Sequence, residues 1–359
     1  MQQTKLDLIS VKTILIHSLT GNNNRMFDPN ARDGCNDPSI HLRERLYQYG
    51  YVLKTADNNA LDDCEWVLFC DGESVKPYAG WRGMARRLKA NLQRRPLFRN
   101  LFDECVKAGL EHRIALFLGE PPSVDPANWD PDLHKLFPLI FTWHDSYIDG
   151  RKFIKIHWPQ ARQFPIVPKI AFKDRKLLVN ISMNKFSHHP RELYSARRDA
   201  IRYFEQNQPE NFDLYGVGWN RPVNILEKIL PFSRQIYRSY RGTVKNKWDV
   251  IPQYRFSLCY ENLYGEPGQV TEKIFDCMRA GCVPIYLGAP NIDNYVDNDA
   301  FIDRRRFNSD SELEAFLSSI TEKEYVRFQE AMLEYLSSDR FAKFLPVAYA
   351  DTIINALKL

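Results

Sequence analysis

VTEKIFDCMRAGCVPIYLG, residues 270–288, places a Glu-Lys pair directly before a helical apolar pattern and an apolar strand. Thr271 precedes the pair and can cap the helix, and Gly281 marks its end. A lysine at a helix N-terminus opposes the helix dipole, so Lys273 costs some stability unless an anion lies close by. Free amides at such an end also attract phosphate. The stretch therefore predicts a helix with an anion site at its start, although an ordinary solvated pair fits the two charges taken alone.

Short apolar runs alternate with amphipathic ones on both sides of this stretch, which is typical of parallel α/β sheets. Strands are expected at 11–19, 51–56, 66–71, 113–120, 139–145, 176–182, 212–219 and 255–262. Helices are expected at 81–109, 191–207, 222–241, 310–320 and 322–337. Pro284, near the start of the last apolar strand, suggests an edge or an end of a sheet.

A chain of 359 residues is too long for one comfortable core, so the alternation predicts two Rossmann-like domains. Prolines 159, 165 and 168 mark the linker. The expected division is 1–160, 161–345 and a C-terminal segment at 346–359. Ligands of parallel sheets bind outside the carboxyl ends of the strands, so a cleft between the two domains is the expected site.

The composition is that of an ordinary soluble protein, with 44% hydrophobic and 26% charged residues. A net charge of +4 weakly supports an anionic ligand and argues against wholesale nucleic-acid binding. The seven cysteines have no CxxC spacing, which argues against zinc and indicates reduced thiols. The N-terminus reads as a first strand and not as a signal peptide, and no run approaches the ~20 apolar residues of a membrane span. We therefore expect a cytoplasmic protein.

A basic run at 81–99 holds no acidic residue. A solvated helix face is the default interpretation, and Pro96 is expected to interrupt the helix. The sharper interpretation is attraction to anionic lipid head groups or to a phosphorylated glycolipid. The run thus leaves peripheral association with the inner membrane open. Its basic residues are Arg82, Arg86, Arg87, Lys89, Arg94, Arg95 and Arg99.

A longer pattern surrounds the opening stretch. FSLCYEN, a variable loop and VTEKIFDCMRAGCVPIYLGAP follow one another in the chain. This pattern resembles the signature of the α-1,3/4-fucosyltransferases, family 10 of the glycosyltransferases. NIDNYVDNDAFID extends the likeness through the C-terminal half, whereas the N-terminal half resembles the family only loosely.

The resemblance implies a GT-B fold, in which two Rossmann-like domains face each other across a cleft. It implies GDP-fucose as donor and inversion at the anomeric centre. Glu272 and Lys273 would contact the donor ribose and phosphate. Glu261 and Asn262 would shape the donor loop.

An arginine of the family that grips the diphosphate has two counterparts here. Arg197 fits its LYSxR pattern, and Arg198 is the alternative. One position departs from the family, because Gln269 stands where some members carry a tyrosine that contacts the donor. Tyr264 is a substitute from the same loop. No DxD triplet is present, so positive side chains and not Mg²⁺ would neutralise the departing diphosphate, and no cofactor is expected.

The candidate general base lies in the N-terminal half, where Glu120 follows the apolar run ALFLG at the carboxyl end of an expected strand. An inverting transferase needs one carboxylate to take the proton of the acceptor hydroxyl. The resemblance implies this role for Glu120, and a loop glutamate that caps local amides is the plain alternative. Asp145 is the second candidate, with His144 beside it.

Together these features predict a metal-independent, inverting α-1,3-fucosyltransferase. Its expected acceptor is a surface-polysaccharide or lipopolysaccharide precursor. Two alternatives stay open: a transferase of the same fold with another nucleotide sugar, and a non-catalytic protein that binds glycans or nucleotides.

Overall fold

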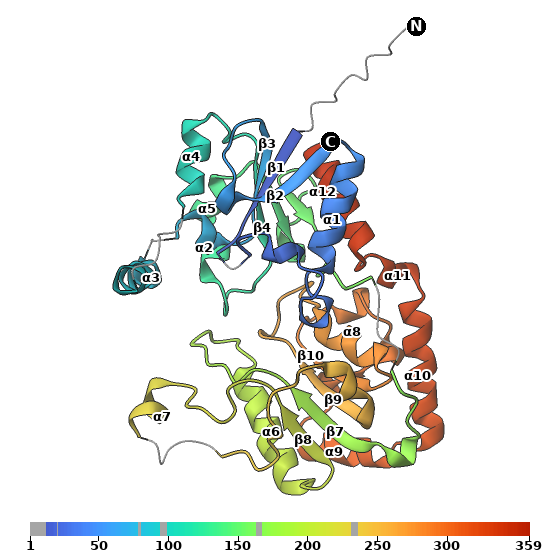
Figure 1. Ribbon diagram of the computed structural model, residues 1–359. Coiled ribbons are helices and arrows are strands. Elements are labelled where there is room, and N and C mark those ends of the chain that lie inside the picture. The colour runs from blue at the N-terminus through green and yellow to red at the C-terminus, as the bar shows by residue number, and fades with distance from the viewer. Residues whose placement is uncertain (1–11, 20, 78–79, 94–98, 163–166, 231–235) are drawn as a thin grey trace, which may run out of the picture. The chain divides into compact units, whose positions relative to one another are not determined.

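The chain forms two compact units in a computed structural model, which describes residues 12–19, 21–77, 80–93, 99–162, 167–230 and 236–359 (Figure 1). The first unit comprises the chain up to Ile156 together with Pro346–Leu359. The second unit comprises His157–Leu345. The C-terminal helix α12 (Pro346–Leu357) therefore packs in the first unit, against α1 (Asp37–Gln48). Residues 346–359 thus belong to the first unit and do not stand apart as the separate segment expected from the sequence.

The first unit is built on a parallel sheet in the order β2-β1-β3-β4-β5-β6. Its strands are β1 (Lys12–His17), β2 (Tyr51–Thr55), β3 (Cys64–Phe69), β4 (Ile114–Leu118), β5 (Leu139–Thr142) and β6 (Phe153–Lys155). Its other helices are α2 (Gly72–Val75), α3 (Gly80–Leu92), α4 (Leu101–Lys107) and α5 (Pro131–Lys135).

The central strand β4 shows why this sheet is covered on both faces. Its five residues are all buried, as expected for a parallel strand between two helical layers. Leu116 packs in the same core cluster as Leu101 of α4. Its neighbour Phe117 points to the other face and packs with Ile353 of α12. The carboxyl end of β4, which leads to Glu120, is thereby fixed from both sides.

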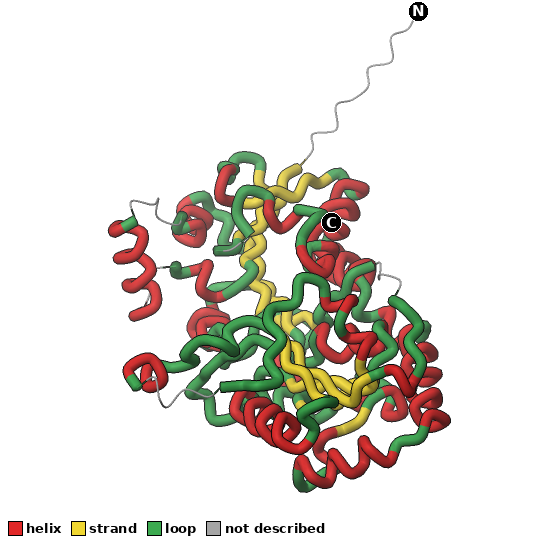
Figure 2. Tube along the Cα trace, turned by 60° about the horizontal axis from the view of Figure 1, so that its bottom comes forward, coloured by secondary structure: helices red, strands yellow, loops and turns green. Residues whose placement is uncertain are grey.

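The second unit is built on a parallel sheet in the order β11-β10-β9-β7-β8. Figure 2 shows the strands of each sheet as a twisted stack with helices beside it. The strands are β7 (Lys176–Ile181), β8 (Phe212–Tyr215), β9 (Tyr254–Tyr260), β10 (Val283–Leu287) and β11 (Ile302–Asp303). The helices are α6 (Tyr194–Asn207), α7 (Ile225–Ile229), α8 (Glu272–Arg279), α9 (Asp310–Ser319), α10 (Glu322–Leu336) and α11 (Asp339–Ala342).

Several local predictions need correction. The single helix expected at 81–109 is two helices, α3 and α4, and the break expected at Pro96 lies outside the described residues. Of the helix expected at 222–241, only α7 is present in the described part. Strand β10 is not at an edge, but β11 pairs only with its third and fourth residues. The missing amide of Pro284 therefore breaks no bond to β11.

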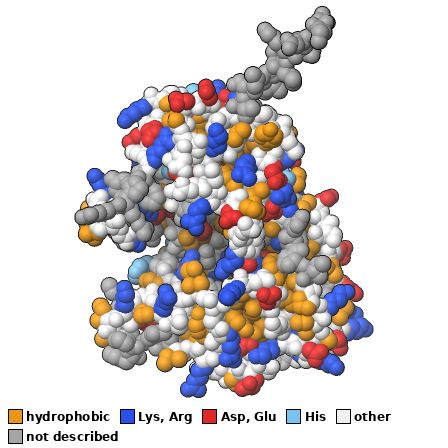
Figure 3. Space-filling view, viewed as in Figure 1, with side chains coloured by type: hydrophobic (Ala, Val, Ile, Leu, Met, Phe, Trp, Pro, Cys, Tyr) orange, Lys and Arg blue, Asp and Glu red, His pale blue; other side chains and the backbone are white. Residues whose placement is uncertain are grey.

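Charges of both signs are interspersed over the surface in Figure 3. All seven cysteines, each in the described part of the chain, are free thiols, and five of them are buried. Among the described residues, no helix combines the length and the apolar character needed to cross a bilayer.

Candidate functional site

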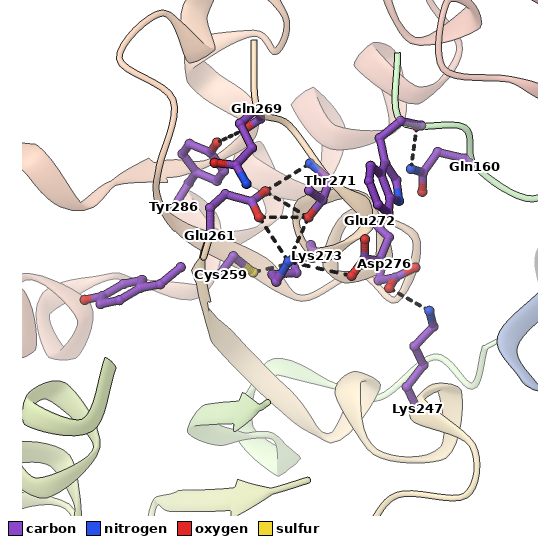
Figure 4. A network of polar contacts seen from close by, with 12 residues as sticks. Gln160, Lys247, Cys259, Glu261, Gln269, Thr271, Glu272, Lys273, Asp276 and Tyr286 are labelled. Atoms are coloured by element: carbon purple, nitrogen blue, oxygen red, sulfur yellow. Dashed lines mark hydrogen bonds and ion pairs between the residues drawn. The ribbon is translucent and has the colours of Figure 1, made fainter. Parts of the chain in front are cut away.

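A buried carboxylate organises the carboxyl edge of the second sheet. Glu261 follows β9 directly and is fully buried. Its Oε1 accepts hydrogen bonds from the amide and the hydroxyl of Thr271, both at 2.9 Å. Its Oε2 lies 3.0 Å from Lys273 Nζ, and Figure 4 shows these contacts converging on the start of α8. The end of β9 and the first turn of α8 are thus held together by one carboxylate.

Lys273 has the anion that its place at a helix start requires. Its ammonium also lies 2.9 Å from Thr271 Oγ1 and 3.7 Å from a carboxylate oxygen of Glu272. Burial alone would lower the pKa of Lys273, but the Glu261 and Glu272 carboxylates raise it above its usual value. The ammonium therefore stays charged, and the chain itself supplies the anion that the sequence could only postulate.

Thr271 occupies the N-cap position of α8, as predicted, but its side chain makes no capping hydrogen bond. The hydroxyl instead contacts both carboxylate oxygens of Glu261. The capping prediction was wrong because a buried carboxylate next to the helix is the stronger acceptor. The Thr271 hydroxyl consequently does not satisfy the amides of the first helical turn, and such amides suit an anionic ligand.

Glu272 is the partly exposed member of this group. Burial works to raise its pKa, but the charges of Lys273 and Lys247 and hydrogen bonds to the carboxylate together lower it. An ionised carboxylate accepts hydrogen bonds on both oxygens, so it can bind two neighbouring hydroxyl groups.

Arg197 and Arg198 point to different surroundings from adjacent positions on α6. Arg197 is buried, and its Nη2 donates to the carbonyls of Tyr260 and Glu261 at 2.6 and 3.1 Å. Burial lowers the pKa of Arg197. Arg198 donates to the Lys185 carbonyl at 2.7 Å. Of the two predicted arginines, only Arg197 is brought to the Glu261 group, where it holds the carboxyl end of β9.

The loop between β9 and α8 carries the remaining predicted donor residues. Gln269 is only 3% exposed, and among the described residues its Oε1 has no hydrogen-bond partner. The main-chain carbonyl of Gln269 accepts from the Tyr286 hydroxyl at 2.8 Å. The Asn262 carbonyl accepts from the Leu193 amide, and the Tyr264 side chain is exposed. The departure from the family thus places a buried amide oxygen in the loop before α8.

Sequence reasoning missed the residue that makes room for Glu261. A Cβ added to Gly288 would lie 2.6 Å from Glu261 Cγ and 2.7 Å from the Tyr286 hydroxyl. Only glycine fits there without displacing one of the two side chains. The signal was the glycine directly after the VPIYL strand. Lys247, which bonds Asp276 of α8 at 2.6 Å, was also missed because no local motif connects them.

In the first unit, side chains clamp the main chain around Glu120. The Glu120 carbonyl accepts from Asn128 Nδ2 at 3.1 Å and Trp129 Nε1 at 3.0 Å. The preceding carbonyl of Gly119 accepts from Trp143 Nε1 at 2.7 Å. Trp129 and Trp143 are thus main-chain anchors, and they fix the loop at the carboxyl end of β4 where a catalytic side chain was predicted.

The second base candidate has a cationic partner, since the Asp145 carboxylate lies 2.6 Å from Lys155 Nζ. His144 is buried and packs against the rings of Trp129 and Tyr147. The ion pair of Asp145 and the ring contacts of His144 are thus structural contacts.

Other acids gather at this edge of the first sheet. Burial raises the pKa of Asp71 to about 6, and the charges of Asp125 and Glu73 act in the same direction. Burial also raises the pKa of Asp125. Within the described ranges, no three His, Cys, Asp or Glu side chains are grouped as a metal site.

Comparison with known proteins adds a family to this geometry. Residues 190–338 match the model described as glycosyltransferase family 10 (fucosyltransferase), C-terminal part. An alpha-(1,3)-fucosyltransferase of Helicobacter pylori is 39% identical over 66 residues, which are 18% of this chain and 14% of that protein. Human alpha-(1,3)-fucosyltransferase 7 is 40% identical over 81 residues, which are 22% of this chain and 23% of that protein. The chain thus spans less than a quarter of the length of either relative.

Solved structures resemble the chain over nearly its whole length. The crystal structure of an alpha1,3-fucosyltransferase has a TM-score of 0.54 at 14% identity, covering 100% of this chain and 93% of its own. A DNA-modifying beta-glucosyltransferase has a TM-score of 0.56 at 10% identity, covering 97% and 100%. The likeness confirms the GT-B fold, with its two parallel-sheet units, while a cleft between them stays a prediction. The matched residues and the Glu261 group both lie in the second unit, which therefore contains the segment that matches the C-terminal part of glycosyltransferase family 10, the fucosyltransferase family.

Proposed function

We propose that this protein transfers L-fucose from GDP-fucose to a glycan hydroxyl, inverting the anomeric centre and forming an α-1,3 linkage. The observation that carries the proposal is the charged group of Glu261, Thr271 and Lys273, which lies inside the family-matched segment at a helix start. Relatives named α-1,3- and α-1,4-fucosyltransferases support the reaction. One structural neighbour is an alpha1,3-fucosyltransferase crystallised with GDP-fucose, which supports the donor.

In this proposal the donor lies at the start of α8. Lys273 contacts the diphosphate and Glu272 accepts hydrogen bonds from the ribose hydroxyls, while Glu261 and Asn262 hold the loop. Arg197 supplies the second cation. A guanidinium carries five N–H donors, so a phosphate contact need not break the two bonds that Nη2 makes to main-chain carbonyls.

The transfer step is a single displacement. The acceptor oxygen forms a bond to the anomeric carbon while the Glu120 carboxylate takes the hydroxyl proton. The bond from the anomeric carbon to the phosphate oxygen breaks, and its electron pair leaves with GDP. Lys273 and Arg197 stabilise the charge that develops on GDP, and we propose that the reaction needs no metal or other cofactor.

Replacing the base tests the catalytic half of the proposal. Glu120→Gln should abolish fucose transfer while GDP affinity, measured by calorimetry, stays nearly unchanged. Asp145→Asn is the matched control and should retain transfer. If Glu120→Gln turns over normally, or if only Asp145→Asn is inactive, Glu120 is not the base. A chain that binds both substrates but never transfers would instead be a binding protein.

Replacing the lysine tests the donor half. Lys273→Ala should weaken GDP binding by at least about tenfold, since a charge-assisted hydrogen bond contributes more than ~1.4 kcal/mol. Lys323→Ala, on the exposed surface of α10, is the control and should bind GDP normally. Unaltered affinity in Lys273→Ala would remove its phosphate role.

The buried oxygen of Gln269 favours testing other donors. A panel of GDP-fucose, GDP-mannose and UDP sugars should be compared by thermal stabilisation. A ligand that binds only the folded state adds about 2.7 kcal/mol at ~100 times its Kd. We expect the largest shift with GDP-fucose. A larger shift with another nucleotide sugar would make the chain a same-fold transferase for that donor.

The acceptor that we propose is a surface-polysaccharide or lipopolysaccharide precursor. The seven free thiols support a reducing, cytoplasmic location. Transfer from labelled GDP-fucose to lipid-linked and to free oligosaccharides would test the acceptor class.

A further inference from the structure

Helix α3 exposes an apolar stripe. The side chains of Met84, Leu88 and Leu92 are 70%, 61% and 76% exposed. Residues four apart lie one above another on a helix, so these three form a continuous line. Apolar side chains in such a line indicate a surface with a partner.

Cations flank the stripe on both sides. Successive helical residues are turned by about 100°, which places Arg87 on one side of the line through Leu88 and Lys89 on the other. Both basic side chains are exposed. In Figure 3, hydrophobic and basic side chains are visible together over α3. The helix sequence GWRGMARRLKANL contains four basic residues and no acid.

The opposite face of α3 already has its protein partner. Arg86 forms an ion pair with Glu73 and donates to the Pro77 carbonyl at 2.7 Å. Gly83 is buried and lines a cavity of about 320 Å³ together with Ala127, which lies in the loop after Glu120. The apolar stripe therefore points away from the first unit, and the packing of this unit leaves it uncovered.

We propose that α3 docks the first unit on an anionic lipid surface. Met84, Leu88 and Leu92 enter the boundary of the acyl chains, and Arg87 and Lys89 bind the acidic head groups. An amphipathic helix with basic flanks is the form that such interfacial helices take. A stable protein interface needs about 20–30 residues a side, far more than this stripe offers. The inference is independent of the proposed transfer reaction.

The position of α3 gives the docking a consequence. The helix follows α2, which begins just after the carboxyl end of β3. Its inner face shares a cavity with the loop behind Glu120. Docking through α3 would thus hold the carboxyl edge of the first sheet close to the lipid surface, where a lipid-linked acceptor would be presented.

Vesicle sedimentation with the full chain tests the proposal. The wild type should bind vesicles of equal parts phosphatidylglycerol and phosphatidylcholine, and binding to pure phosphatidylcholine should be at least about tenfold weaker. Met84→Ser/Leu88→Ser/Leu92→Ser and Arg87→Glu/Lys89→Glu should each weaken binding to the acidic vesicles at least about tenfold. Raised salt should weaken vesicle binding of the first variant at least as strongly as that of the wild type, because the attraction that this variant keeps is electrostatic.

Matched controls come from α10, which also has exposed apolar and basic residues. Val326→Ser/Leu333→Ser and Lys323→Glu/Arg327→Glu should bind vesicles as the wild type does. Fucose transfer to a soluble acceptor and the free energy of unfolding should be unchanged in both α3 variants. Equal loss in the α10 variants, or vesicle binding that ignores the α3 changes, would overturn the proposal. So would self-association of the wild type, seen by light scattering and absent from the α3 variants, because a second copy would then cover the stripe.

Discussion

The carboxyl edges of the two sheets differ in how their charged side chains are grouped, because opposite charges are paired at one edge and like charges are neighbours at the other. In the second unit the carboxylates of Glu261 and Glu272 face Lys273, and the pKa of Glu272 is lowered. In the first unit Asp71 lies near the like charges of Asp125 and Glu73, and burial raises its pKa to about 6. One edge therefore pairs opposite charges, and at the other burial raises the pKa of carboxyl groups.

This difference matches two tasks that the proposed reaction requires. Binding a diphosphate needs a cation that is held in place before the ligand arrives, and internal pairing with Glu261 holds Lys273. Taking a proton from a hydroxyl needs a carboxylate in surroundings that make it basic. At the edge of the first sheet, burial raises the pKa of Asp71 and Asp125 in this way.

Removing the buried carboxylate of Glu261 should disrupt the charge pairing at the second edge and have the largest effect on stability. Glu261→Gln leaves Lys273 without its closest anion and takes an acceptor from Thr271. We expect the free energy of unfolding in urea to fall by about 3 kcal/mol, the cost of breaking a largely buried ion pair. Glu272→Gln, which loses only a partly exposed contact, should cost less than about 1 kcal/mol.

A double variant tests whether the loss comes from the pair. Combining Glu261→Gln with Lys273→Met removes both charges, so the double variant should lose clearly less than the sum of the two single losses. Strict additivity would mean that Glu261 acts through Thr271 alone, and the contrast between the edges would then not be one of paired charge.

Two glycines allow a matched comparison of the edges. Gly288→Ala would push against the Glu261 and Tyr286 side chains, and Gly72→Ala would put a Cβ 2.6 Å from the main chain of Ala127. Each should destabilise its unit by about 2 kcal/mol through overpacking. Gly288→Ala should also weaken GDP binding.

Gly72→Ala should instead reduce transfer and leave GDP affinity unchanged. Asn128 Oδ1 accepts a hydrogen bond from the Gly72 amide at 2.6 Å, and Asn128 Nδ2 donates one to the Glu120 carbonyl. A displacement of Asn128 would therefore also move the main chain of the candidate base. Equal losses of GDP affinity in both glycine variants would argue that the two edges do not divide binding and catalysis.

The residues of the second edge could largely be predicted because they lie close together in one stretch of the chain. A strand, a loop and a helix within 30 residues of sequence contain Glu261, Thr271, Glu272 and Lys273. What the sequence could not give was which anion faces Lys273. That depends on how the loop folds Glu261 back over Thr271, and on the space left by Gly288.

The first edge was harder because its contacts join distant segments. The position of Glu120 followed from the end of an apolar strand, but the clamps from Asn128 and Trp129 depend on the path of the loop. The packing of α12 on α1 joins the two ends of the chain, and no periodicity signals it. Strand β6 was missed because three half-buried residues leave no pattern.

The smallest expected effect is the pH dependence of the first edge. Asp71 has a folded-state pKa of about 6, above its unfolded value of 3.8. Its contribution to stability is therefore complete below pH ~4 and is lost as the pH rises through about 6. Asp71→Asn can keep the Asp71 side-chain oxygen that caps α2 but cannot titrate. Relative to the wild type, it should gain about 1–2 kcal/mol of unfolding free energy between pH 4 and 7.

Urea unfolding at several pH values measures this gain. A residue of the first unit whose pKa is shifted in the opposite direction provides the control. The exposed Asp132 has its pKa lowered by its hydrogen bond and ion pair with Lys135, so Asp132→Asn should not gain stability as the pH rises. If the Asp71→Asn curve runs parallel to that of the wild type, Asp71 ionises normally. The proposed contrast between the two edges would then be wrong.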